Sequence, residues 1–140
     1  MRQLAWALVA LLVACSKDEP PPIVADEWVL PLEKQSLDST VIATLTDANP
    51  APPALGNNTW TLQLADAEGN PLEGLDLKAR LYMPKHGHGS SPTMVHAGDV
   101  AGEYVIERMN FFMGGVWEVT LYADSLTTDQ DVVFLPNIPD

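Results

Sequence analysis

The chain has 140 residues, with 19 acidic against 7 basic side chains, a formal net charge of −12 and a single cysteine. This length predicts one domain. The charge argues against a nucleic-acid partner, because phosphates are bound by clustered Lys and Arg and the chain has no basic stripe. One cysteine excludes an intramolecular disulfide and a zinc site built from thiolates. Twelve prolines and nine glycines indicate short elements joined by turns, which is typical of all-β proteins.

The first 14 residues have the layout of a secretory signal peptide, in which a basic start precedes a short apolar run. The run from Leu4 to Ala14 is too short for a permanent membrane helix, which needs about 20 residues. It ends in Leu12-Val13-Ala14-Cys15, which resembles the lipobox of bacterial lipoproteins. That resemblance implies cleavage before Cys15 and a lipid on its sulfur, so that Cys15 anchors the protein to a membrane. The alternative is a free or buried thiol.

Residues 15–26 are charged and rich in proline, and such a segment is expected to form a semi-extended tether. Ser16, directly after the cysteine, resembles the sorting position of lipoproteins sent to an outer membrane. We therefore expect an exported protein held at the outer membrane and facing the periplasm. Removal of residues 1–14 takes away Arg2 and no acid, which makes the mature chain more acidic still.

From residue 27 to residue 140 the apolar residues follow a period of two, as expected for strands with one buried face. Gly-, Pro- and Asn-containing turns separate the segments. This pattern predicts one immunoglobulin-like β-sandwich of about seven strands, with Trp28, Trp60 and Trp117 as the largest core side chains. The expected strands are 40–45, 59–64, 77–83, 93–97, 103–109, 116–122 and 131–135.

All three histidines and four of the five methionines lie between Met83 and Met113. Imidazole and thioether groups are the ligands expected at copper sites. Glycines surround His86 and His88, and histidines two positions apart project to the same side of an extended chain. If this loop folds back as a hairpin, the candidate ligands would meet at one end of the sandwich. They are Met83, His86, His88, Met94 and His96.

Several short motifs in this region resemble the YtkA-like domain, a small extracytoplasmic β-sandwich related to FixH-like proteins. The motifs lie within residues 58–124, and the resemblance implies a role in handling copper or in assembling copper-containing oxidases. They are Met83-Pro84, His86-Gly87-His88-Gly89, Gly102-Glu103-Tyr104 and Phe112-Met113-Gly114-Gly115-Val116-Trp117-Glu118-Val119, with Trp60-Thr61-Leu62, the turn from Asp66 to Pro71 and the segment from Leu77 to Leu81 upstream.

Two interpretations of the function remain open. In the first, the loop from Met83 to His96 binds or transfers a copper ion, and no covalent chemistry takes place. The ligands would be His86, His88 and His96 for Cu(II), with Met83 and Met94 joining them for Cu(I). In the second, the domain is an accessory module that docks onto an envelope protein through a sheet edge or loops, and the histidines are incidental. Met109 and Met113 are expected to fill the core. An enzyme is not expected, because Ser90 and Ser91 lie in no recognisable catalytic motif.

Overall fold

The computed structural model describes residues 21–140. The predicted signal peptide, the predicted lipidation site Cys15 and the first part of the tether lie outside the described residues. The strands are β1 (Leu32–Gln35), β2 (Val41–Asn49), β3 (Gly56–Asp66), β4 (Leu77–Met83), β5 (His88–Gly89), β6 (Met94–Ala97), β7 (Glu103–Phe111), β8 (Gly115–Val116), β9 (Glu118–Ala123), β10 (Val132–Phe134) and β11 (Asn137–Ile138), and one 3₁₀ turn, η1, spans Thr128–Gln130.

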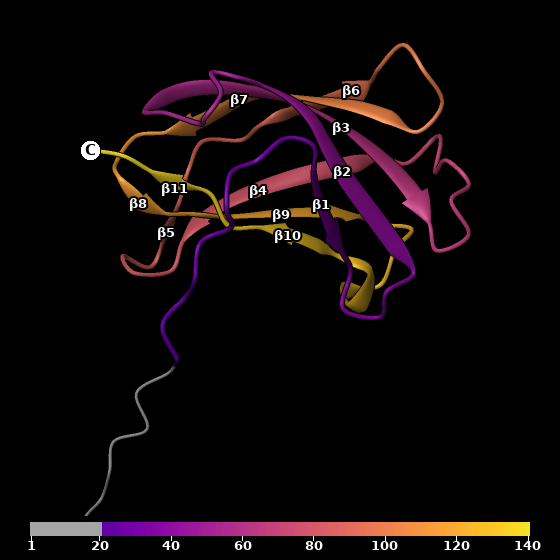
Figure 1. Ribbon diagram of the computed structural model, residues 1–140, viewed down its shortest axis with the longest axis horizontal. Helices are drawn as coiled ribbons and strands as arrows, with labels where there is room; N and C mark the ends of the chain where they lie inside the picture. Colours follow the sequence, from indigo (N-terminus) through magenta and orange to yellow (C-terminus); the bar gives the residue numbers. More distant parts are fainter. Residues whose placement is uncertain (1–20) are drawn as a thin grey trace, which may run out of the picture.

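The strands form two main antiparallel sheets and one small one. The larger sheet has the order β1-β2-β3-β7-β6, the second has the order β10-β9-β4-β5, and β11 pairs with β8 at one end. Figure 1 shows the two main sheets as two layers, with β5, β8 and β11 gathered at the end where the C-terminus lies. The predicted all-β sandwich is confirmed.

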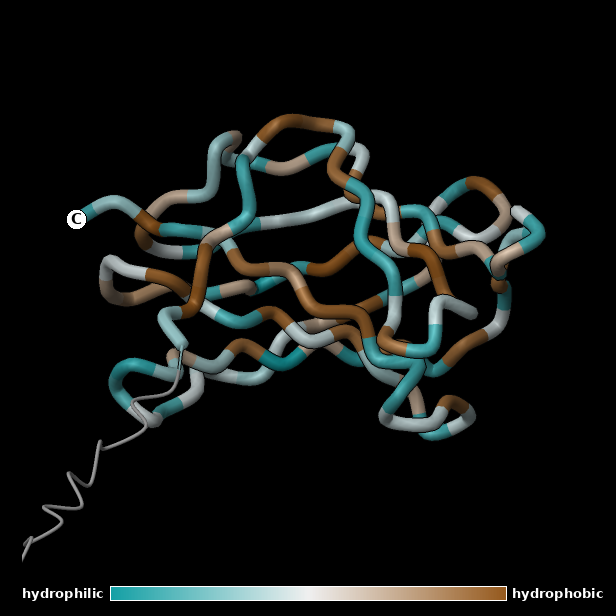
Figure 2. The backbone as a smooth tube through the Cα atoms, turned by 60° about the horizontal axis from the view of Figure 1, so that its bottom comes forward, coloured by the Kyte–Doolittle hydropathy of each residue, from teal (hydrophilic) through white to brown (hydrophobic). Residues whose placement is uncertain are grey.

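The core forms because each long strand buries every second residue. In β3 the inward positions are Trp60, Leu62 and Leu64, which are at most 1% exposed, while the residues between them are half-buried. In Figure 2 hydrophobic and hydrophilic residues alternate along the strands in the same way. Inward side chains of both main sheets contribute to one hydrophobic cluster.

All seven predicted strands are present, with ends that differ by a few residues. Strands β5, β8 and β11 were not predicted as separate strands, because two residues carry no periodicity, and the four-residue β1 was also missed. Trp60 and Trp117 are fully buried as expected. Trp28 is half-buried at the edge of the core, where its ring lies 5.3 Å from that of Trp60.

The predicted tether joins the domain at Asp26. Its backbone N–H donates to the carbonyl of Leu135 at 2.8 Å, and its carboxylate accepts the N–H of Leu135 at 2.7 Å. Lys34 forms an ion pair with the same carboxylate. Asp26 therefore belongs to the ordered domain rather than to the tether. Within residues 21–140 no helix is long and apolar enough to cross a membrane.

Candidate functional site

A tight hairpin between β4 and β5 positions the first two histidines. The N–H groups of His86 and Gly87 both donate to the carbonyl of Met83, at 3.1 and 2.8 Å, and Met83 lies directly opposite His88 in the strand register. Gly87 has a φ of +69°, a conformation that side chains rarely adopt. The glycine at this position is therefore what allows the chain to turn back and bring His88 beside Met83.

The hairpin holds the two imidazole rings close together. The ring centroids of His86 and His88 are 5.9 Å apart, with 30° between the planes. His86 is exposed, whereas His88 is half-buried against the end of the sandwich. The pair thus combines one ring that is open to solvent with one that is partly shielded from it.

Met113 completes the contact of His88 with the rest of the molecule. Its Sδ lies 3.2 Å from Nε2 of His88, although the residues are 25 positions apart. The carbonyl of Met113 accepts a hydrogen bond of 2.9 Å from the indole N–H of Trp117, which holds the Met113 backbone in place. The sequence assigned Met113 to core packing, and it does pack against the core. Its contact with His88 was missed.

Two aromatic rings enclose His88. Phe112 stacks on the imidazole at 5.1 Å with 26° between the planes, and Trp117 meets it edge-on at 5.9 Å. Phe112 is 52% exposed, so it covers the imidazole from the solvent side. The alternation around Phe111 and Phe112 could have revealed this position, because a large apolar residue that faces outward next to a buried one is unusual.

Met83 lies on the inner side of His88. The two residues are register partners in an antiparallel pair, so their side chains extend to the same face of the sheet. Met83 is fully buried. Gly115 makes room for it, since a Cβ atom at Gly115 would lie 2.6 Å from the Met83 methyl. The structure therefore groups Met83, His86, His88 and Met113.

Met94 and His96 are not part of this group. Both lie on β6, the edge strand of the other main sheet, and both are exposed. His96 pairs with Val105 near the start of β7, whereas Phe112, which stacks on His88, follows the other end of β7. The strand between these two points spans about 20 Å at the usual rise of a strand. Nε2 of His96 lies 3.6 Å from a carboxylate oxygen of Glu107. The five predicted ligands are thus divided between two places, because the link between β5 and β6 crosses from one sheet to the other.

The family model described as YtkA-like matches residues 39–122. The chain belongs to the YtkA-like family. Searches of curated proteins and of solved structures found no match. The matched region runs from the turn before β2 to β9 and contains both the hairpin of His86 and His88 and the segment with Met113.

Part of the YtkA-like pattern serves the fold rather than the site. The hydroxyl of Tyr104 donates to the carbonyl of Leu72 at 2.8 Å and accepts the N–H of Leu75 at 3.1 Å. Gly102 has a φ of +74°, and a Cβ there would lie 2.6 Å from the carbonyl oxygen of Leu64. The motif Gly102-Glu103-Tyr104 therefore fastens the connection between β3 and β4 to the core.

The donor set near His88 suits copper, which takes imidazole nitrogen and soft sulfur ligands. Within the described part of the chain no three His, Cys, Asp or Glu side chains gather closely enough to hold a metal ion. The further donor that the structure places beside His88 is the methionine sulfur of Met113. Two imidazoles and two thioethers are available at this end of the sandwich.

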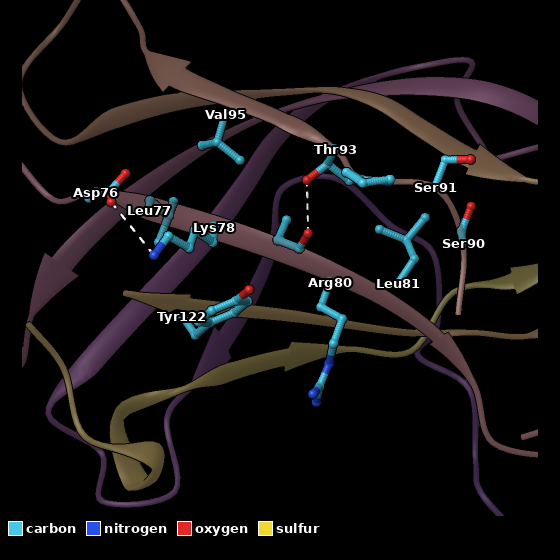
Figure 3. A pocket seen from close by; sticks show the side chains of 12 residues that line it. Asp76, Leu77, Lys78, Arg80, Leu81, Ser90, Ser91, Thr93, Val95 and Tyr122 are labelled. Atoms are coloured by element: carbon cyan, nitrogen blue, oxygen red, sulfur yellow. Dashed lines mark hydrogen bonds and ion pairs between the residues drawn. The ribbon is translucent and has the colours of Figure 1, made fainter. Parts of the chain in front are cut away.

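A groove of about 490 Å³ lies away from His88, between β4 and the segment that leads from β5 to β6. Figure 3 shows Thr93 bonded to the backbone of β4, through a hydrogen bond of 2.8 Å from its hydroxyl to the carbonyl of Ala79, and Arg80 directed away from Thr93. On this side β4 pairs with β5 at Tyr82 and Met83, and no other described strand pairs with it there. The stretch from Leu77 to Leu81 is an edge that no described strand covers, although the carbonyl of Leu81 also accepts the N–H of Ser90 at 3.2 Å. The edge is therefore only partly open.

Proposed function

We propose that this YtkA-like protein is an exported, lipid-anchored protein that binds a copper ion at the hairpin of His86 and His88 and transfers it to an envelope partner. The observation that carries the proposal is the convergence of three donors: the stacked rings of His86 and His88, and the sulfur of Met113 at 3.2 Å from His88. Methionine sulfur remains a ligand in an oxidising compartment, where free thiols are converted to disulfides.

The different exposure of the two imidazoles supports transfer as well as binding. His86 is exposed and lies on a turn, so it can exchange an ion with a partner. His88 is half-buried and fixed between Met113 and Phe112, which suits retention. The net charge of the chain favours the approach of cations, since a negative surface raises their local concentration.

A copper titration of the purified full-length protein tests the binding. We expect one ion per chain, measured by competition with a chromophoric chelator. A His86→Ala, His88→Ala double variant should lose this ion. A His96→Ala variant is the matched control, because His96 lies on β6 near Glu107 and away from the hairpin; it should bind as the wild type does. Binding weaker than micromolar in the wild type would contradict the proposal.

The anchor is tested separately through Cys15. A Cys15→Ser variant removes the sulfur that would carry the lipid, so the protein should leave the membrane fraction or stay unprocessed. Fractionation of cells followed by mass measurement of the chain distinguishes these outcomes. If Cys15→Ser fractionated and migrated as the wild type does, the lipid anchor would be wrong while the copper proposal would stand.

A second candidate function, docking onto an envelope protein, has one observation in its favour. No described strand pairs with the edge of β4 from Leu77 to Leu81, so this edge offers to an added strand the backbone groups that Thr93 and Ser90 do not use. A module that only docks would bind no stoichiometric copper. Its association would be blocked by Ala79→Pro on this edge and would be unaffected by the His86→Ala, His88→Ala variant.

A further inference from the structure

His88 contacts a thioether and two aromatic rings. Its Nε2 lies 3.2 Å from the thioether sulfur of Met113. Phe112 stacks on the imidazole ring, and Trp117 meets the ring edge-on. Trp117 is fully buried. An ion bound here would be shielded from water on the side of the two aromatic rings.

A second thioether lies at the inner end of the same cluster. Met83 is the register partner of His88, shares its face of the sheet and is fully buried. The Met83 methyl is within reach of Gly115, the residue that follows Gly114 in the loop of Met113. The Met83 side chain is thus held by the packing of the sandwich, and the loop of Met113 is held by the hydrogen bond from Trp117 to the Met113 carbonyl.

The chemical type of the donors indicates which oxidation state of copper this cluster prefers. Among residues 21–140, carboxylates, histidines and cysteines form no group of three that could hold a metal ion. Divalent copper favours several nitrogen or oxygen ligands, whereas thioethers select the soft monovalent ion.

We infer that the cluster of His88, Met113 and Met83 selects soft monovalent cations, Cu(I) and Ag(I), over Cu(II), with Phe112 and Trp117 as the wall that excludes water. This inference rests on the proposed copper function and deepens it, since it names the oxidation state and assigns the two sulfur ligands. His86 then serves entry and exchange of the ion rather than its retention.

Silver nitrate titrated into the metal-free, full-length protein tests the selectivity, with tryptophan fluorescence as the readout. Ag(I) should quench the fluorescence with an end point of one equivalent, and a Trp117→Phe variant should lose this quenching. Cu(II), added without reductant, should bind at least about 100-fold more weakly than Ag(I), a difference of about 2.7 kcal/mol. Equal affinity for Cu(II) and Ag(I) would overturn the inference.

Met113→Leu tests the sulfur ligand, because leucine keeps a similar volume and removes the thioether. Its Ag(I) affinity should fall at least about tenfold, while Met94→Leu, the matched control on β6, should bind normally. In the wild type, Ag(I) should also shift the methyl NMR signals of Met83 and Met113 and leave that of Met94 in place, a measurement that needs no variant to fold. Unchanged affinity in Met113→Leu, or unshifted Met83 and Met113 signals, would overturn the inference.

The failure of this inference is distinguishable from failure of the proposed function. Cu(II) bound through His86 and His88 with no silver site would refute the monovalent selectivity and leave copper binding intact. No binding of either metal would refute both.

Discussion

Nε2 of His88 lies 3.2 Å from Sδ of Met113, and this contact joins the hairpin after β4 to the turn between β7 and β8. The two segments belong to different sheets, so the contact forms only when the sandwich closes at this end. Phe112, the neighbour of Met113, stacks on the same imidazole. The predictions below test this end of the molecule first and then the fold that supports it.

Replacing Phe112 should alter the surroundings of His88 without unfolding the domain. Phe112→Leu removes the ring that stacks on the imidazole at 5.1 Å, so the His88 ring protons should lose its shielding and move downfield in the NMR spectrum. Because Phe112 is 52% exposed, the free energy of unfolding should change by no more than about 1 kcal/mol. The ring protons of His96 on β6 are the internal reference and should stay in place. Unmoved His88 signals would contradict the stacking.

Gly115 should be more sensitive to substitution than another glycine with positive φ. Gly115→Ala places a Cβ 2.6 Å from the buried methyl of Met83, whereas Gly56→Ala at φ +94° meets nothing within 4 Å. Both variants bear the backbone strain of about 1–2 kcal/mol. Gly115→Ala should lose about 1 kcal/mol more, because Met83 has to move within a packed core. Urea unfolding of the two variants measures the difference, and equal losses would show that Met83 does not fill this space.

Leucines at buried and exposed positions provide a matched test of the core. Leu62 in β3 is 0% exposed, and Leu62→Ala should destabilise the protein by about 2–5 kcal/mol. Leu37, in the turn after β1, is 83% exposed, and Leu37→Ala should change the free energy of unfolding by at most about 0.5 kcal/mol. Thermal and urea unfolding give both values. Similar losses in the two variants would be incompatible with β3 as a central strand.

The sequence predicts the fold better than it predicts the site, for a physical reason. Strands such as β3 and β9 carry a period of two over six or more residues, and that local signal survives without knowledge of the partner strands. The proximity of His88 to Met113 depends instead on how two loops meet across the sandwich. Spacing along the chain placed His96 with His88, yet the link between β5 and β6 changes sheets and separates them.

The turn at Asp66 should make stability depend on pH in the acid range. The side-chain and backbone N–H groups of Asn70, and the backbone N–H of Glu68, donate to the Asp66 carboxylate and hold its pKa below the ordinary value of 3.8. The folded state therefore favours the charged form, so this contribution is present above pH 3.8 and is lost as the pH falls through the lowered pKa. Asp66→Asn should flatten the fall in the urea midpoint as the pH is lowered past 3.8.

The control for Asp66 is Glu73→Gln, which removes one exposed carboxylate and leaves the Asp66 turn intact. It should keep the pH dependence of the wild type more closely than Asp66→Asn does. An Asp66→Asn variant whose midpoint falls as steeply as that of the wild type would show that this turn does not contribute to acid sensitivity.

X-ray absorption at the copper edge of the full-length protein, loaded with one equivalent of copper under reductant, tests the copper proposal most directly. The arrangement of His86, His88, Met113 and Met83 predicts a shell that contains both imidazole nitrogen and thioether sulfur. A shell of oxygen and nitrogen alone, or a protein that retains no copper after desalting, would contradict it.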